Sequence, residues 1–181
     1  MAPRLDDQQA EKAGHIEWLL TDVDGVLTDG RLYYDADGER LKAFDVKDGL
    51  GIKLAQKAGI HVGVLSSRAS GALDRRVAEL GFDVSMTGKA DKRSAFQEFL
   101  SEYGTTAERV AYVGDDLGDL PVLSLCGLSF APADAVSEVK ALVDVVLGPA
   151  GGHGAIRELV ELLLQSRGDW ERIIASYSAG G

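Results

Sequence analysis

The sequence has little cysteine, little proline and no long hydrophobic run. Cys126 is the one cysteine among 181 residues, so no disulfide can form within the chain, and a reducing compartment is expected. The four prolines form no Pro-rich linker, and the length suits one domain with a full hydrophobic core. No stretch approaches the length of a membrane span, and residues 1–14 lack the apolar core of a secretory signal peptide. We therefore expect a cytoplasmic protein without a membrane partner.

Positive charge is also scarce. Lysine and arginine number 19 against 29 aspartates and glutamates, and the net charge at pH 7 is −10. A chain this acidic disfavours nucleic acid as a partner. An anionic substrate would need a locally positive site within the acidic surface.

The chain does contain a regular alternation of strand-like and helix-like segments. Most of the strand-like segments are short apolar runs without polar alternation, typical of parallel strands buried on both faces. The pattern predicts an α/β fold with a doubly wound parallel sheet, which binds ligands beyond the carboxyl ends of its strands. The expected strands are residues 16–23, 60–66, 82–86, 109–113, 127–130 and 143–147, and the expected helices are 50–58, 70–80, 94–103, 117–125 and 155–165.

One segment interrupts the alternation. Two apolar stretches flank the turn sequence Asp35-Ala36-Asp37-Gly38, which predicts a β-hairpin at about residues 30–46. A lone two-stranded hairpin is marginal in water, so we predict that another subunit covers it; the alternative is a hairpin folded onto its own domain. The expected division is a polar extension at 1–15, a main domain at 16–167 and a tail at 168–181 whose start is amphipathic.

An acidic cluster closes the first strand, in the sequence Asp22-Val23-Asp24-Gly25. Side chains two apart on a strand project to the same side, so Asp22 and Asp24 are expected to lie together. Like charges held close repel unless a cation or a shared proton compensates them. Gly25 lets the backbone turn and approach a ligand closely. The cluster therefore indicates a site for a metal ion and a phosphate group.

Three later elements are expected at the same edge of the sheet. An apolar strand ends in Ser66-Ser67-Arg68, Lys92 stands at the start of a helix, and another apolar strand runs into further acids. Carboxyl ends of parallel strands meet at one edge, where a doubly wound sheet has its site. The acids of the last element are Asp115, Asp116 and Asp119.

With these four motifs in this order, the chain resembles the phosphatases of the haloacid dehalogenase superfamily, from about residue 18 to residue 165. Segments 22–30, 44–52 and 151–158 resemble its small subgroup that lacks a separate cap domain. Members of that subgroup are Mg²⁺-dependent homotetramers whose hairpins pack together, so the resemblance implies Mg²⁺ as cofactor and a homotetramer formed through the hairpin. The implied substrate is a phosphorylated acidic sugar, first of all 3-deoxy-D-manno-octulosonate 8-phosphate, a precursor in lipopolysaccharide synthesis.

The resemblance also implies a role for each motif. Asp22 would be the nucleophile that forms an aspartyl-phosphate, and Asp24 would be the general acid and then the base for water. Lys92 would keep Asp22 ionised and offset the charge of the phosphate. Ser66 and the backbone N–H of Ser67 would hydrogen-bond the phosphoryl oxygens, and the turn at Gly25 could add further backbone donors.

The same resemblance assigns the metal ligands and the substrate contacts. Mg²⁺ would bind the Asp22 carboxylate, the Asp24 carbonyl and the Asp115 carboxylate, with Asp116 and Asp119 orienting metal-bound water. Arg68 would clamp the carboxylate of the sugar, and Lys47 stands where relatives often carry a basic residue. The roles of His153, which stands where many relatives have Arg or Lys, and of Arg157 stay open.

Three other functions remain as alternatives. The substrate could instead be a sialic-type 9-phosphate, but Arg68 favours the octulosonate ester, because related enzymes for the 9-phosphates can carry an acid at this position. A receiver-type signalling domain also combines a parallel sheet, clustered aspartates and a lysine, but Asp24 argues against one because a receiver must retain its phosphate. A catalytically inactive oligomerisation module is disfavoured by the intact set of Asp22, Asp24, Ser66, Lys92 and Asp115.

Overall fold

A central parallel sheet organises the molecule. The computed structural model describes residues 4–178, and within them the sheet has six strands in the order β5-β4-β1-β6-β7-β8, as the alternation predicted. Successive strands after β1 are added first on one side and then on the other, which makes β1 and its neighbours the switch point where such sheets bind ligands. The strands are β1 (Trp18–Thr21), β4 (His61–Leu65), β5 (Val84–Met86), β6 (Val110–Val113), β7 (Leu128–Ala131) and β8 (Val145–Val146).

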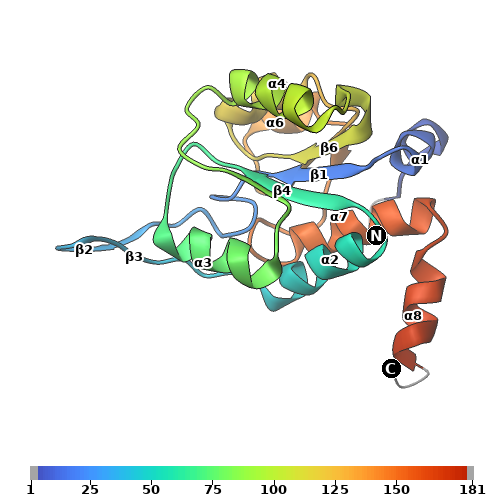
Figure 1. The fold of residues 1–181 in the computed structure, drawn as a ribbon, viewed down its shortest axis with the longest axis horizontal. Helices are drawn as coiled ribbons and strands as arrows, with labels where there is room; N and C mark the ends of the chain where they lie inside the picture. The colour runs from blue at the N-terminus through green and yellow to red at the C-terminus, as the bar shows by residue number, and fades with distance from the viewer. Residues whose placement is uncertain (1–3, 179–181) are drawn as a thin grey trace.

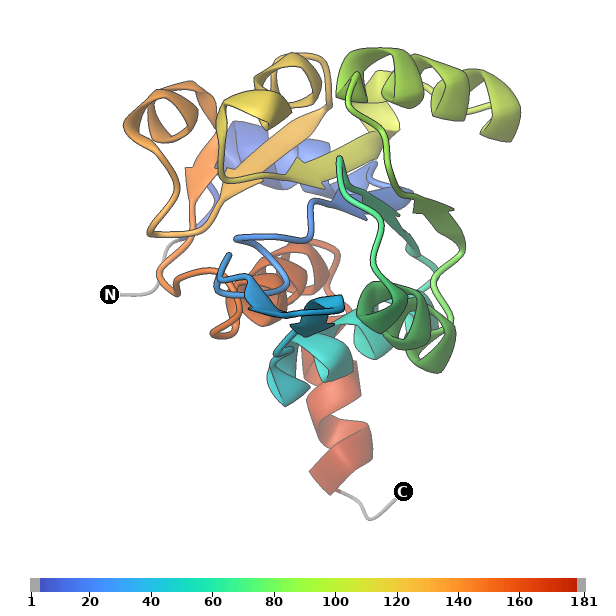
Figure 2. The ribbon, with the colours of Figure 1, turned by 90° about the vertical axis from the view of Figure 1, so that its left-hand side faces the viewer.

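Helices cover both faces of the sheet (Figures 1 and 2). One layer contains α2 (Val46–Lys57), α3 (Gly71–Leu80) and α7 (Ala155–Ser166), and the opposite layer contains α4 (Lys92–Tyr103), α5 (Leu120–Leu123) and α6 (Ser137–Leu142). The segment predicted as a helix over 117–125 is divided into a 3-10 turn, η2 (Leu117–Asp119), and the short α5, which has a proline in its first turn. A further 3-10 turn, η1 (Ala107–Arg109), precedes β6. None of the helices in residues 4–178 is both long and apolar enough to cross a membrane.

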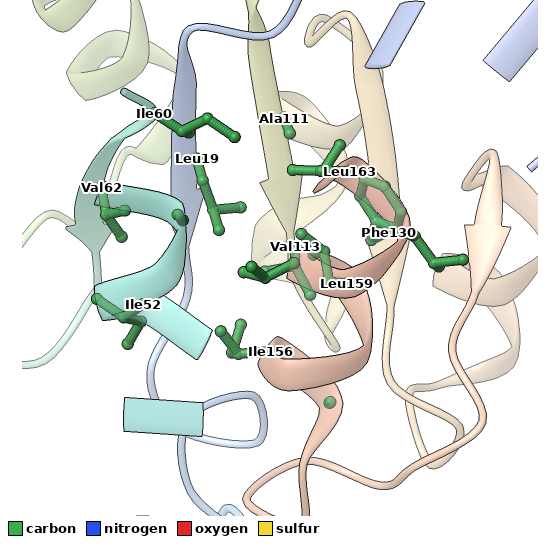
Figure 3. Packing of buried hydrophobic residues seen from close by; sticks show 14 of the residues in the cluster. Leu19, Ile52, Ile60, Val62, Ala111, Val113, Phe130, Ile156, Leu159 and Leu163 are labelled. Atoms are coloured by element: carbon green, nitrogen blue, oxygen red, sulfur yellow. The ribbon is translucent and has the colours of Figure 1, made fainter. Parts of the chain in front are cut away.

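The larger core cluster lies between the sheet and the layer of α2 and α7 (Figure 3). Leu19 of β1 and Val62 of β4 lie near Ile52 of α2, while Leu159 and Leu163 of α7 pack on the same face of the sheet near β6 and β7. All five side chains are buried. Replacing one such leucine by alanine typically costs about 2–5 kcal/mol of folding free energy, so this packing fixes the strand ends from below.

The hairpin forms as predicted but with shorter strands. It consists of β2 (Tyr33–Asp35) and β3 (Gly38–Leu41), and it projects beyond the edge of the domain (Figure 1). Asp35 pairs with Gly38 across a two-residue loop. Exposed apolar side chains cover it: Leu32, Tyr33, Tyr34 and Leu41 are each between 40% and 58% accessible.

Both ends of the chain contain a helix that the sequence pattern did not predict in full. The expected polar extension includes α1 (Asp7–Gly14), which begins at a capping box of Asp6 and Gln9 and is tied to the domain by Lys12, 3.3 Å from Asp144. The expected tail contains α8 (Trp170–Ser178), whose Ile173 is buried. Residues 179–181, the end of the expected tail, lie outside the described residues.

Candidate active site

A buried lysine joins two of the predicted acids. The Nζ atom of Lys92, at the start of α4, lies 2.6 Å from Asp22 Oδ1 and 2.6 Å from Asp119 Oδ1. All three side chains are buried. Tyr112 on β6 donates its hydroxyl proton to Asp119 over 2.6 Å and completes the cluster from below. The strand ends of β1 and β6 thus bring together groups that are 70 and 27 residues from Lys92 in the sequence.

A third carboxylate stands beside this cluster. Asp22, Asp115 and Asp119 each offer an oxygen within 4.8 Å of the others, which is a group able to hold a metal ion. Asp115 Oδ1 is buried and has no hydrogen-bond partner among the residues that the structure describes. Asp119 Oδ2 accepts the backbone N–H groups of Asp115 at 3.1 Å and Asp116 at 3.3 Å, which fixes the loop after β6.

The acids of this group repel one another. Burial and the negative charge of Asp119 raise the pKa of Asp22 to about 6, although Lys92 opposes the shift. Burial and the charges of Asp22 and Asp119 raise the pKa of Asp115 to about 8. Burial would lower the pKa of Lys92, but its two carboxylate partners raise it, so the lysine stays charged. One lysine therefore does not neutralise three carboxylates, and a divalent cation fits the unpaired oxygen of Asp115.

Gly25 is required where the loop after β1 passes this group. Its φ is +98°, and a Cβ at this position would collide with the carboxylate of Asp115. The carbonyl of Gly25 in turn lies so close to Gly151 that a Cβ there would also collide. Gly152 donates its N–H to the carbonyl of Val26 over 2.8 Å. The glycine-rich turn before α7 is therefore packed on the loop that bears the two motif aspartates.

Asp24 has different partners from Asp22. Its Oδ1 forms an ion pair with Lys42, which follows β3, and its Oδ2 lies 3.6 Å from Nε of Arg68. Arg68 donates to the hydroxyl of Tyr34 over 2.6 Å, so the loop after β4 and the hairpin meet beside Asp24. Asp22 and Asp24 were expected to lie together, but Asp24 faces the hairpin while Asp22 faces α4. The reason is that β1 ends at Thr21, so the alternation of a strand does not extend to the two aspartates.

Of the remaining predicted residues, some lie in the loops beside the acidic group and one lies in a separate hollow. Ser66 is buried at the end of β4 and its Oγ accepts the N–H of Arg68 over 3.2 Å, whereas Ser67 is exposed beside it. Asp116 caps η2 by accepting the N–H of Leu117 over 2.7 Å. Lys47 is exposed on the first turn of α2 and lines a separate hollow of about 550 Å³ with His153.

Arg157 lies within α7, away from this chemistry. Its Nε donates to Glu161 over 2.5 Å, and its guanidinium lies 5.3 Å from the ring centre of Trp170. The contact with Trp170 joins α7 to α8.

Several residues in and around the site were not predicted from the sequence. Lys42, Glu39 and Tyr34 come from the hairpin, and Tyr112 reads as one more apolar residue of a buried strand. Asp48 is buried on α2 and accepts the N–H of Arg157 over 2.8 Å and of Gly154 over 3.3 Å, which caps α7 beside the glycine-rich turn. The sequence Lys47-Asp48-Gly49 contains an acid shortly before a predicted helix. It does not indicate that this acid is buried or which backbone groups it contacts.

Comparison with known proteins agrees with this geometry. The haloacid dehalogenase-like hydrolase family matches residues 83–159. The 3-deoxy-D-manno-octulosonate 8-phosphate phosphatase KdsC of Haemophilus influenzae is 51% identical over 158 residues, which cover 87% of this chain and 88% of that protein. The KdsC of Escherichia coli K12 is 44% identical over 157 residues, covering 87% and 84%.

A solved structure extends the likeness to the fold. The 3-deoxy-D-manno-octulosonate 8-phosphate phosphatase from Moraxella catarrhalis, solved in complex with a magnesium ion, a phosphate ion and KDO, superposes with a TM-score of 0.92. It is 34% identical, and the match covers 96% of this chain and 99% of that one.

Proposed function

The chain belongs to the 3-deoxy-D-manno-octulosonate 8-phosphate phosphatases within the haloacid dehalogenase-like hydrolases, and we propose that it hydrolyses this ester to the free sugar and phosphate. It is a phosphomonoester hydrolase, and the free sugar would serve lipopolysaccharide precursor synthesis. The observation that carries the proposal is the buried group of Asp22, Lys92, Asp119 and Asp115, with its unpaired carboxylate oxygen. That group suits attack on a phosphate ester, and a catalytically inactive oligomerisation module would not need it.

In the proposed reaction, a carboxylate oxygen of Asp22 attacks phosphorus while the bond from phosphorus to the sugar oxygen breaks. Asp24 gives a proton to the departing sugar alkoxide and later takes one from the water that hydrolyses the aspartyl-phosphate. Lys92 supports the first step because its charge, 2.6 Å from Asp22, favours the ionised nucleophile. Ser66 and the Ser67 backbone would donate to the phosphoryl oxygens as charge develops on them.

The residues present fit a magnesium ion. The carboxylates of Asp22 and Asp115 and the carbonyl of Asp24 would hold it, and Asp119 offers a further oxygen within 4.8 Å. When bound, Mg²⁺ supplies positive charge that offsets the repulsion between the phosphate ester and the acids. The raised pKa of Asp115, about 8, marks this carboxyl as the one that gains most from such a charge.

Arg68 is proposed to bind the carboxylate of the sugar. Its guanidinium is exposed and lies beside Asp24, where the sugar end of the ester would project. Its present partners are Tyr34 at 2.6 Å and Glu39 at 3.4 Å, so the substrate would share or replace these contacts. Gly25 and Lys47 complete the proposed binding residues, and Lys47 lines the separate hollow beside His153.

The assembly is proposed to be a homotetramer formed through the hairpin. Support comes from the exposed apolar side chains on β2 and β3 and from the projection of the hairpin beyond its own domain (Figure 1). The single cysteine favours a cytoplasmic location.

Phosphate release from a panel of esters tests the substrate. The panel would hold the octulosonate 8-phosphate, a sialic-type 9-phosphate and neutral hexose phosphates, each with Mg²⁺ and with a chelator. Preference for the octulosonate ester with Mg²⁺ is expected. Equal or faster turnover of the 9-phosphate would keep the mechanism and change the substrate, and no Mg²⁺-dependent release from any ester would overturn the proposal.

A further inference from the structure

The hairpin reaches back to the site of its own chain. Although its strands project into solvent, Tyr34, Glu39 and Lys42 contact the segment after β1 and the loop after β4. These contacts join residues that are 18 to 34 positions apart in the sequence. The hairpin is therefore part of the wall around Asp24 in addition to any role between subunits.

Lys42 is the most deeply buried member of this group. Only 2% of its side chain is accessible, which is rare for lysine unless the charge is paired. It is paired twice, with Asp24 Oδ1 and with Glu39 Oε2 at 3.3 Å. Each motif aspartate thus has its own buried lysine: Lys92 holds Asp22 and Lys42 holds Asp24.

Glu39 fixes the position of Lys42 relative to the loop after β4. Its Oε1 accepts a hydrogen bond from Ser70, and its Oε2 lies 3.4 Å from Arg68 as well as 3.3 Å from Lys42. One carboxylate therefore joins the hairpin to the start of α3. Since Oδ2 of Asp24 faces Arg68 at 3.6 Å, the two oxygens of Asp24 are held by cations from two different elements.

From these contacts we infer that Lys42 is a positioning residue, which holds the Asp24 carboxyl in place for proton transfer to the leaving group, with Glu39 as its anchor. The inference deepens the proposed phosphatase function and rests on it. It does not depend on which sugar is the substrate, because Lys42 acts through Asp24 and not through Arg68. A displaced proton donor slows departure of a poor leaving group strongly and of a good one weakly.

Two simple esters without a carboxylate separate this role from sugar binding. Phenyl phosphate has a poor leaving group and para-nitrophenyl phosphate a good one. The value of kcat/KM covers the steps up to departure of the leaving group, so it excludes the later hydrolysis of the aspartyl-phosphate. For Lys42→Met, we expect kcat/KM to fall on the order of tenfold or more for phenyl phosphate and less than about threefold for para-nitrophenyl phosphate.

Two further variants make the test decisive. Lys42→Met leaves the carboxylates of Asp24 and Glu39 facing each other, and their repulsion can prevent folding. In that case the double variant Lys42→Met/Glu39→Gln, which removes the repulsion, is used in place of the single variant. Lys57→Met on the exposed last turn of α2 is the matched control and should leave the ratio of the two kcat/KM values at that of the wild type.

Equal losses for the two esters in the folded variants would overturn the positioning role while leaving the phosphatase function intact. Absence of Mg²⁺-dependent turnover of these two esters and of the octulosonate ester by the wild-type protein would overturn the proposed function and the inference together. Separate measurement on the octulosonate ester distinguishes the two failures from a wrong sugar assignment.

Discussion

Asp22 is the side chain whose replacement separates the chemistry from the fold. Asp22→Asn keeps the shape and retains a hydrogen-bond acceptor for Lys92, whose second partner Asp119 is unchanged. Without a nucleophile, phosphate release should fall roughly 10⁴-fold or more. Circular dichroism and the oligomeric mass should match those of the wild type. Turnover within tenfold of the wild type would contradict the assignment of Asp22.

The raised pKa values predict how stability of the metal-free protein depends on pH. The pKa of the Asp22 carboxyl is about 6 and that of Asp115 about 8 in the folded protein, against 3.8 as the ordinary value. The folded state therefore retains protons that the unfolded chain has released, so stability present at low pH is lost as the pH rises through 6 and 8.

Thermal unfolding with a chelator and with Mg²⁺ measures this effect. We expect Mg²⁺ to raise the Tm more at pH 8.5 than at pH 5.5, because the cation replaces the missing protons. Asp115→Asn should weaken the dependence on pH in the metal-free protein. A rise in Tm that is the same at both pH values would contradict the placement of the cation among these acids.

At the scale of elements, Asp48 connects α2 to the start of α7. Its carboxylate accepts the N–H groups of Gly154 and Arg157, and the adjoining turn supports Gly25. Asp48→Ala should lower the free energy of unfolding by about 1–2 kcal/mol through loss of the cap, and should also lower activity by loosening the turn.

Urea unfolding and Mg²⁺-dependent turnover measure the two effects. Asp45→Ala is the matched control, because Asp45 caps α2 by accepting the N–H of Lys47 and its carboxylate forms no hydrogen bond with the turn in the part of the chain that the structure describes. The control should lose stability and keep its activity. An Asp48→Ala variant with full activity at saturating Mg²⁺ would show that the cap does not support the site.

Some helices and strands could be predicted from the sequence and others could not. The buried strands were predicted to within about two residues at most ends, because runs such as that at 61–65 are apolar throughout and parallel strands leave no other pattern. Helix α1 was not predicted, since its single buried residue, Ala13, gives almost no apolar periodicity. Its position depends on contacts with Asp144, more than 130 residues away.

In the site, too, some residues could be predicted from the sequence and others could not. Asp22, Ser66, Lys92 and Asp115 could be predicted because the topology brings strand ends to one edge. Lys42 and Tyr112 could not, because one depends on the path of the hairpin and the other looks like a core residue. Asp119 was expected to orient water, and the structure places it in contact with Lys92 and within reach of a cation.

At the scale of the whole molecule, the hairpin is expected to control assembly. Leu41, 46% accessible on β3, pairs across the hairpin with Tyr33. Leu41→Asp places a charge in the proposed contact between subunits, where its desolvation is unfavourable. Light scattering should give a tetramer for the wild type and a smaller species for the variant.

Leu142→Asp, at a similarly exposed leucine of α6, is the control and should remain a tetramer. A monomeric wild type, or a Leu41→Asp variant of unchanged mass, would contradict assembly through the hairpin.

The most direct test of the whole mechanism is to trap the covalent intermediate. Protein mixed with the octulosonate ester, labelled at phosphorus, and Mg²⁺ would be quenched in acid within one turnover and digested for peptide mapping. We predict transient label on the peptide that contains Asp22, dependent on Mg²⁺ and absent from Asp22→Asn. Label on another residue, or release of phosphate with no labelled protein at any time within the turnover, would contradict it.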